Sequence, residues 1–345
     1  MSGTMTCEER IIKTLRREPV DRVPSFEWII DKSVINALMP GASEIEFIFE
    51  NDLDAICVDL DYTSESIGNG HVRDEWGQIK GFTKEGHAFP ISGPLKEPDD
   101  LKSYVPPDPH KPERFRSLEK TLDKYGGEKA IVVHLNDVYS IPSRLMKYDD
   151  FLCCLVDEPE FISDLISMTV DIQLELADEI VKRGAKICYT GDDFAYVNGP
   201  VMSPACFREL FFEPFKRVIG GFKKAGLYVI KHTDGDIHSL IDMIVDGGID
   251  CLDPIDRIAG MDLQDVKTRF GHRVAIKGNV DCVGTLVTGS VQDVEEDVKN
   301  CLRIGAPGYG YILSSSNSIH SSVKPENYKA MLETFREYRD YPVRL

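Results

Sequence analysis

The chain has 345 residues, of which 42% are hydrophobic, so it has enough apolar material for a sizeable core and is not globally disordered. Its 58 acidic and 40 basic side chains give a net charge of −18 at pH 7, which opposes binding to nucleic acids and to anionic membranes. Nine cysteines without paired CxxC spacing and an N-terminus without an apolar segment predict a cytoplasmic protein with reduced thiols.

Predicted helices and strands alternate along most of the chain. Thr6 and Glu9 form a capping box before apolar residues at helical spacing, which predicts an N-terminal helix. Apolar, β-branched runs predict strands at 23–29, 54–60, 129–135, 186–191, 227–232, 249–253, 272–277 and 309–314. Amphipathic stretches predict helices at 112–125, 159–183, 203–224, 236–246, 262–270, 290–303 and 324–338.

Strands and helices in this alternation favour an α/β protein with a single (βα)₈ TIM barrel and an N-terminal helical extension. A Gly-rich fingerprint is missing after the first strand, which disfavours a dinucleotide-binding sheet. The segment 63–112 interrupts the alternation, and its DEWGQIKGF run alternates like a β-hairpin. We therefore expect one domain over 1–345, with an insertion at about 63–112 that lies over one mouth of the barrel.

Polar residues gather directly after five neighbouring predicted strands. In a (βα)₈ barrel, the carboxyl ends of the strands form the face that carries the catalytic residues. The polar residues are Asp192, Asp193, His232, Asp234, Asp253, Asn279, Asn317 and His320. His232 and Asp234 alternate at a strand end, so their side chains lie on one face, and imidazole with carboxylate suits zinc or a comparable divalent ion. A third ligand would come from Asp192, Asp193, Asn317 or His320. Capping of the next helix is the alternative role for Asp234.

Longer motifs resemble the uroporphyrinogen decarboxylase superfamily, whose members are (βα)₈ barrels. They include DRVPSFEW, DEWGQI, ISGPLKEPDDL, GPVMSPACFRELFFEPFKRVI, VIKHTDGDI, IKGNVDC and the ending VKPENYKAMLETF. The chain is most similar to the corrinoid-linked methyltransferases of this superfamily, which exchange methyl groups between a small molecule and a cobalamin-carrying protein. That branch holds zinc through His-x-Cys and a further Cys, and here His232 matches the histidine. Asp234 and Asn317 stand in place of the two cysteines, so oxygen donors replace thiolates.

The resemblance implies a methyltransferase that moves a methyl group between a small methylated compound, such as an ether or amine, and a corrinoid protein. Demethylation of an ether requires a proton or a metal ion on the leaving oxygen. The expected catalytic residues are His232, Asp234, Asp192 and Asp193, with His232 and Asp234 as metal ligands; Glu27, Asn279, Asn317 and His320 are expected to bind the substrate. The implied cofactors are a divalent metal, zinc first, and a corrinoid from a partner protein. The sequence leaves open the methyl donor and the oligomeric state, a homodimer among them.

Two other functions stay open from the sequence. One is cofactor-free decarboxylation of a uroporphyrinogen-like substrate, and the other is a non-catalytic barrel that binds a tetrapyrrole or corrinoid. The decarboxylase branch binds its carboxylates with arginines in an N-terminal segment. Here the matching residues 24–31 contain no arginine and include two acids, Glu27 and Asp31. The negative charge of these acids would repel a substrate with many carboxylates.

Overall fold

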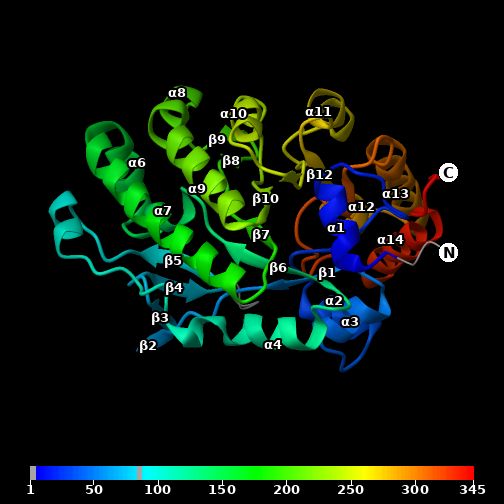
Figure 1. Ribbon diagram of the computed structural model, residues 1–345, viewed down its shortest axis with the longest axis horizontal. Helices are drawn as coiled ribbons and strands as arrows, with labels where there is room; N and C mark the ends of the chain where they lie inside the picture. Colours follow the sequence, from blue (N-terminus) through cyan, green and yellow to red (C-terminus); the bar gives the residue numbers. More distant parts are fainter. Residues whose placement is uncertain (1–4, 84–87) are drawn as a thin grey trace.

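A curled parallel sheet of seven strands lies at the centre of the molecule (Figure 1), in a computed structural model that describes residues 5–83 and 88–345. The strands lie side by side in chain order: β1 (Ala55–Val58), β6 (Ala130–Leu135), β7 (Ile187–Thr190), β10 (Tyr228–His232), β11 (Cys251–Asp253), β12 (Ala275–Val280) and β13 (Tyr311–Ser315). All neighbouring strands are parallel. The α/β class and seven of the eight predicted strands are therefore confirmed.

The predicted eighth strand, residues 23–29, is not a strand in the structure. Ser25 makes a single parallel bridge to Leu313 of β13, and its carbonyl accepts a hydrogen bond from the Asp54 N–H beside β1. Pro24 has no N–H, and the Ser25 N–H donates to the Asp54 carboxylate at 3.0 Å, so the segment cannot continue a ladder. It contacts both edges of the sheet without becoming an eighth strand.

The helices surround the sheet, most of them on its outer face (Figure 1). They are α1 (Cys7–Leu15), α2 (Lys32–Leu38), α3 (Glu44–Glu50), α4 (Arg116–Tyr125), α5 (Ser140–Arg144), α6 (Tyr148–Asp157), α7 (Pro159–Lys182), α8 (Pro204–Cys206), α9 (Phe212–Ala225), α10 (Ile241–Asp246), α11 (Leu263–Phe270), α12 (Thr285–Thr288), α13 (Val291–Gly305) and α14 (Pro325–Tyr338). Short 3₁₀ turns occupy Pro98–Lys102 and Pro112–Phe115, and a π-helical turn, Phe207–Phe211, joins α8 to α9. In the described residues, no helix combines the length and apolar character needed to cross a membrane.

Helix α1 closes one end of the curled sheet and leaves the other end open. The predicted capping box is present, with the Glu9 N–H donating to Thr6 Oγ1 and the Thr6 N–H donating to Glu9. Ile11 and Leu15 of α1 pack into a buried cluster with small residues from the strands, among them Ala130. Because α1 fills the end where the strands begin, the accessible end is the one where they finish.

The insertion forms a four-stranded antiparallel sheet of β2 (Ser64–Gly68), β3 (His71–Asp74), β4 (Ile79–Phe82) and β5 (Ala88–Ser92). The predicted hairpin corresponds to β3 and β4, and Asp74 Oδ1 accepts the N–H groups of Trp76 and Gln78 in its turn, each at 3.0 Å. Strands β2 and β5 were not predicted: both are mostly exposed, β2 has no apolar run, and Pro90 interrupts the short apolar run of β5. That the whole chain is one domain stays a prediction.

Candidate functional site

Asp193, His232 and Asp234 converge where β7 and β10 end. Each offers one ligating atom, and these three atoms lie within 4.8 Å of one another. His232 Nε2 is 3.4 Å from Asp234 Oδ1 and 3.7 Å from Asp193 Oδ1. The Asp234 N–H donates to Asp193 Oδ1 at 3.1 Å, which ties the two loops together. The pair predicted from strand alternation thus meets a third side chain, from one of the two loops expected to supply it.

Asp253 orients the His232 ring from behind. Pairing of β10 with β11 places His232 directly beside Asp253, whose Oδ2 lies 2.6 Å from His232 Nδ1. Asp253 Oδ2 also accepts from the Tyr189 hydroxyl at 2.5 Å, and Oδ1 accepts from Lys277 Nζ at 2.7 Å. Burial alone would raise the pKa of Asp253, but Lys277 and His232 lower it to about 2. The ionised carboxylate can only accept, so Nδ1 carries a proton and Nε2 points toward Asp193 and Asp234.

The cluster is electrostatically set for a positive charge. Burial would lower the pKa of His232, but Asp234 and Asp253 raise it to about 10. Asp234 Oδ2 accepts a hydrogen bond from Asn317 Nδ2 at 2.6 Å, whereas Asp234 Oδ1 is buried and makes no hydrogen bond, although the His232 ring lies nearby. A buried carboxylate oxygen without a donor is costly. A proton on Nε2 or a cation between the three side chains would offset that cost.

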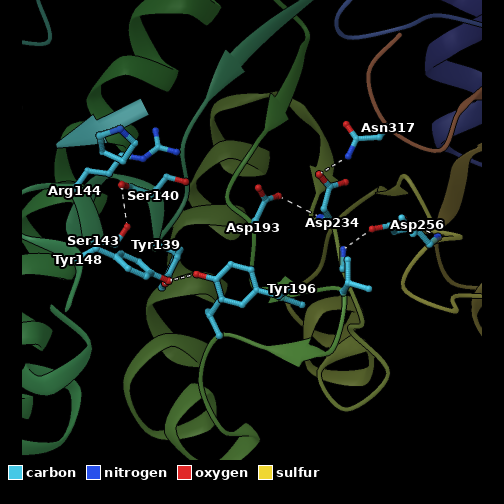
Figure 2. Close-up of a pocket in the computed structure, with 16 residues that line it drawn as sticks. Tyr139, Ser140, Ser143, Arg144, Tyr148, Asp193, Tyr196, Asp234, Asp256 and Asn317 are labelled. Atoms are coloured by element: carbon cyan, nitrogen blue, oxygen red, sulfur yellow. Dashed lines mark hydrogen bonds between the residues drawn. The ribbon is translucent and has the colours of Figure 1, made fainter. Parts of the chain in front are cut away.

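A cavity of about 660 Å³ opens beside this cluster. Asp193, Asp234 and Asn317 line one side of it, and Arg144 of α5 lies on the opposite side (Figure 2). Hydroxyl groups line the wall between them: Ser140 and Ser143 from α5, Tyr148 from α6, and Tyr196. The Tyr148 and Tyr196 hydroxyls are 2.6 Å apart, and the Tyr139 hydroxyl is 2.8 Å from that of Tyr148. Sequence reasoning missed these wall residues, because α5 and α6 were not predicted as helices.

Trp28 packs against the ring of His232. Its ring centroid lies 5.3 Å from that of His232, 4.8 Å from that of His134 and 4.5 Å from that of Tyr189. A Cβ at residue 191 would lie 2.5 Å from the Trp28 ring, so the glycine there makes room for it. Trp28 was not predicted as a site residue, and its place in the DRVPSFEW motif was the one signal that could have found it.

Asp192, one of the four expected catalytic residues, does not line the cavity. Its carboxylate is fully buried and accepts from Asn136 Nδ2 at 2.9 Å and from the N–H groups of Tyr139 and Ser140 at 2.7 and 2.9 Å. Burial would raise the pKa of Asp192, but Lys231 and these hydrogen bonds lower it to about 2. Adjacent residues project in different directions, so Asp193 reaches the cluster while Asp192 holds the start of α5.

Three residues expected to bind substrate are also absent from the cavity wall. Asn279 is buried and donates from Nδ2 to the Ile255 carbonyl at 2.9 Å. His320 Nε2 lies 3.1 Å from the Cys282 carbonyl. Both therefore hold neighbouring loops.

Glu27 is the third of these residues, and it is buried against β13. Its carboxylate accepts from the Ser315 N–H at 2.9 Å and from Ser315 Oγ at 2.8 Å. Burial raises the pKa of Glu27 to about 7, with Lys277 and Ser315 opposing the shift. Of the four expected substrate-binding residues, Asn317 alone lines the cavity.

The family model for uroporphyrinogen decarboxylase (URO-D) matches residues 83–338. The methylcobamide:CoM methyltransferase MtbA of Methanosarcina mazei is 22% identical, over 97% of this chain and 98% of that protein. The uroporphyrinogen decarboxylase of Hydrogenovibrio crunogenus is 20% identical, over 95% and 96%.

A solved methyltransferase structure from Methanosarcina mazei superposes with a TM-score of 0.77 at 18% identity, and the match covers 97% of this chain and 99% of that one. The likeness in structure concerns the fold, and the family match covers well over half of the sequence. The resemblance inferred from the motifs is confirmed, and the chain belongs to the uroporphyrinogen decarboxylase family.

Proposed function

We propose that this protein is a corrinoid-dependent methyltransferase that moves a methyl group between a small methylated ether or amine and a corrinoid protein. The observation that carries the proposal is the Asp193–His232–Asp234 cluster at the end of the cavity, with Asp234 Oδ1 buried and unsatisfied. The likeness to relatives named methylcobamide:CoM methyltransferases supports the same reading. The partner expected is a corrinoid-binding protein, which brings the methyl acceptor or donor to the open end.

The three side chains fit a divalent metal ion. The carboxylates of Asp193 and Asp234 balance a charge of +2. Asp253 binds His232 Nδ1, so Nε2 faces the two carboxylates, and this carboxylate–histidine arrangement is common among metal-bound histidines. Nitrogen and oxygen donors suit zinc and neighbouring divalent ions, although a site without thiolates binds zinc less tightly. Such an ion would act as a Lewis acid toward the oxygen or nitrogen that loses the methyl group.

The protein side chains around the cluster have separate tasks in this reaction. The methyl transfer breaks a carbon–oxygen or carbon–nitrogen bond and forms a bond from carbon to the corrinoid cobalt, and the leaving group keeps the electron pair. The charge that develops on the leaving atom needs compensation at the cluster. When no ion is bound, His232 carries the proton on Nε2 that could neutralise it. Trp28 and Tyr189 cover the ring of His232 and limit access of water.

Decarboxylation of a uroporphyrinogen-like substrate is the alternative, because relatives named uroporphyrinogen decarboxylase also match. A tetrapyrrole with many carboxylates requires several cationic partners. Among the described residues that line the cavity, Arg144 is the single arginine or lysine, while Asp193, Asp234 and Asp256 are acids. Asp59, which directly follows β1 and could hold pyrrole N–H groups in such a reaction, is paired with His134 at 2.8 Å. The lining therefore favours methyl transfer.

Anaerobic spectroscopy with cob(I)alamin tests the proposal. Purified enzyme, loaded with Zn²⁺, is mixed with cob(I)alamin and methylated ethers or amines, and conversion to methylcobalamin is followed while released CO₂ is measured from uroporphyrinogen in parallel. We expect methylcobalamin formation by the parent and by His272→Ala, whose exposed histidine precedes β12 at the far end. We expect at least a hundredfold slower conversion by His232→Ala. Release of CO₂ without any methylcobalamin would favour the decarboxylase, and tight binding of a tetrapyrrole or corrinoid without turnover would favour the non-catalytic barrel.

A further inference from the structure

A second cavity, of about 380 Å³, lies between the inserted sheet and the ends of β1 and β6. The inserted strands contribute Asp74 and Lys80 to its lining, and the central sheet and its helices contribute His134 and Gln173. Arg144 of α5 lines this cavity and also the first one. The two cavities therefore meet at this side chain. No role was predicted for this second cavity.

Most charged groups in the lining of the second cavity are paired within the protein. Lys80 Nζ lies 2.6 Å from Asp74 Oδ2, and His134 Nδ1 lies 2.8 Å from Asp59 Oδ1. Arg144 differs: among the described residues, none makes an ion pair or hydrogen bond with its guanidinium. This guanidinium, with five N–H donors, thus lines both cavities without a protein partner among the described residues, and its side chain is exposed to solvent.

A buried amide in the same lining also lacks a partner. Gln173 is 1% exposed, and its Oε1 accepts a hydrogen bond from the Asn136 N–H at 3.0 Å. That bond fixes the orientation of the amide, because the oxygen must face the N–H. Gln173 Nε2 is buried and has no hydrogen-bond partner. Buried donors are almost always satisfied, so this one points to a ligand acceptor.

We propose that the second cavity binds an anionic group, a carboxylate or a sulfonate, of the same small molecule whose methyl group lies at the Asp193–His232–Asp234 cluster. Arg144 and Gln173 Nε2 are the two donors, and the oxygens of the anion are the acceptors. The carboxylates at the far side of the first cavity repel an anion, so the molecule can enter in one orientation only. The position of the methyl group rests on the proposed function, whereas the anion site is tested without any methyl transfer.

Calorimetric binding of three probes to the Zn²⁺-loaded enzyme, in the absence of corrinoid, tests the anion site. The probes are 4-methoxybenzoate, 4-methoxybenzenesulfonate and neutral methoxybenzene, which share the ring and the methyl group. We expect the parent to bind at least one of the anions at least tenfold more tightly than methoxybenzene. The preferred anion identifies the substrate class as carboxylates or sulfonates.

Variants assign that preference to the two donors. Arg144→Gln should weaken binding of the anion by about 10- to 100-fold, the effect of one lost charge-assisted hydrogen bond, and leave methoxybenzene within twofold. Gln173→Glu keeps the acceptor for the Asn136 N–H and replaces the free donor by a negative charge, so it should weaken the anion at least as much. Lys147→Gln removes a positive charge three residues from Arg144 and should leave all affinities within threefold, since Lys147 is exposed and outside both linings.

Equal affinity for the anions and methoxybenzene, no saturable binding of either anion, or unchanged anion binding by Arg144→Gln would each overturn the site. Arg144 is exposed, so its substitution leaves the fold intact, and thermal unfolding checks the buried Gln173→Glu variant. If Arg144-dependent binding is found and no methyl group reaches cob(I)alamin, the anion site stands and the methyltransferase proposal fails.

Discussion

Competition between protons and metal ions at His232 should make Zn²⁺ affinity rise steeply with pH. The carboxylates of Asp234 and Asp253 raise the pKa of His232 to about 10, so below pH 10 an ion must displace one proton from Nε2. The apparent association constant should therefore increase about tenfold for each pH unit between pH 6 and pH 9. The total change is about a thousandfold, or ~4 kcal/mol at 1.36 kcal/mol per unit.

The decisive interval lies between pH 7 and pH 9. A histidine with the ordinary pKa of about 6.5 is already neutral there, so its metal affinity would be nearly flat, whereas the carboxylates around His232 predict a further increase of about a hundredfold. Isothermal titration with Zn²⁺ buffered by a chelator measures the affinity, and repeating it in buffers of different ionisation enthalpy counts the protons released. We expect one proton released per ion at pH 8.

Two variants connect this pH dependence to the residues. Asp253→Asn keeps an acceptor for His232 Nδ1 and removes the charge, so the pKa of His232 should fall and the rise above pH 7 should become shallower. Asp236→Asn alters a comparable aspartate–histidine pair, with His238 at 2.7 Å, and should change nothing. A plateau in the parent above pH 7, or binding without proton release, would refute the electrostatic reasoning.

Three further outcomes are expected. Burial would raise the pKa of Glu75, but the N–H of Thr63 and neighbouring cations lower it to about 2. The contribution of the Glu75 carboxylate to stability is therefore complete above pH ~4.5 and is lost as pH falls toward 2. Glu75→Gln should lower the free energy of unfolding in urea by up to about 3 kcal/mol at pH 7, and by less at pH 3. Gly235→Ala should lower the unfolding free energy by about 2 kcal/mol or more, because φ is +88° and a Cβ would lie 2.6 Å from the Ala195 carbonyl carbon; a change below about 0.5 kcal/mol would contradict this. Chromatographic assay of uroporphyrinogen should show no turnover, because among the described residues Arg144 is the single arginine or lysine in the cavity lining while Asp193, Asp234 and Asp256 add negative charge, and measurable coproporphyrinogen would restore the decarboxylase alternative.

Local patterns in the sequence were sufficient for the elements and for part of the cluster. The hydrophobic periodicity located seven strands and the long helices, because apolar runs between polar turns leave few alternatives. Alternation at one strand end was enough to pair His232 with Asp234. The prediction of an eighth strand at 23–29 was wrong because the start of this segment lacks free N–H donors for a ladder. Pro24 has no N–H, and the Ser25 N–H donates to the Asp54 carboxylate.

The rest of the site depends on contacts between distant segments. Whether Asp192 or Asp193 faces the cluster is decided by the direction of the loop after β7, which no local pattern specifies. Asp253 meets His232 through the register between two strands, and Arg144 reaches the cavities from a five-residue helix with little periodicity. Such contacts between distant segments follow from the packed fold and not from spacing along the chain.

The proposed methyl transfer centres on one divalent ion bound by Asp193, His232 and Asp234. X-ray absorption at the metal edge of Zn²⁺-loaded enzyme, compared with His232→Ala, measures these ligands directly. We expect a first shell of nitrogen and oxygen at about 2.0–2.2 Å with one imidazole, and loss of the imidazole signal in the variant. Sulfur at about 2.3 Å, or an imidazole signal that survives in His232→Ala, would contradict the assignment of this cluster as the metal site.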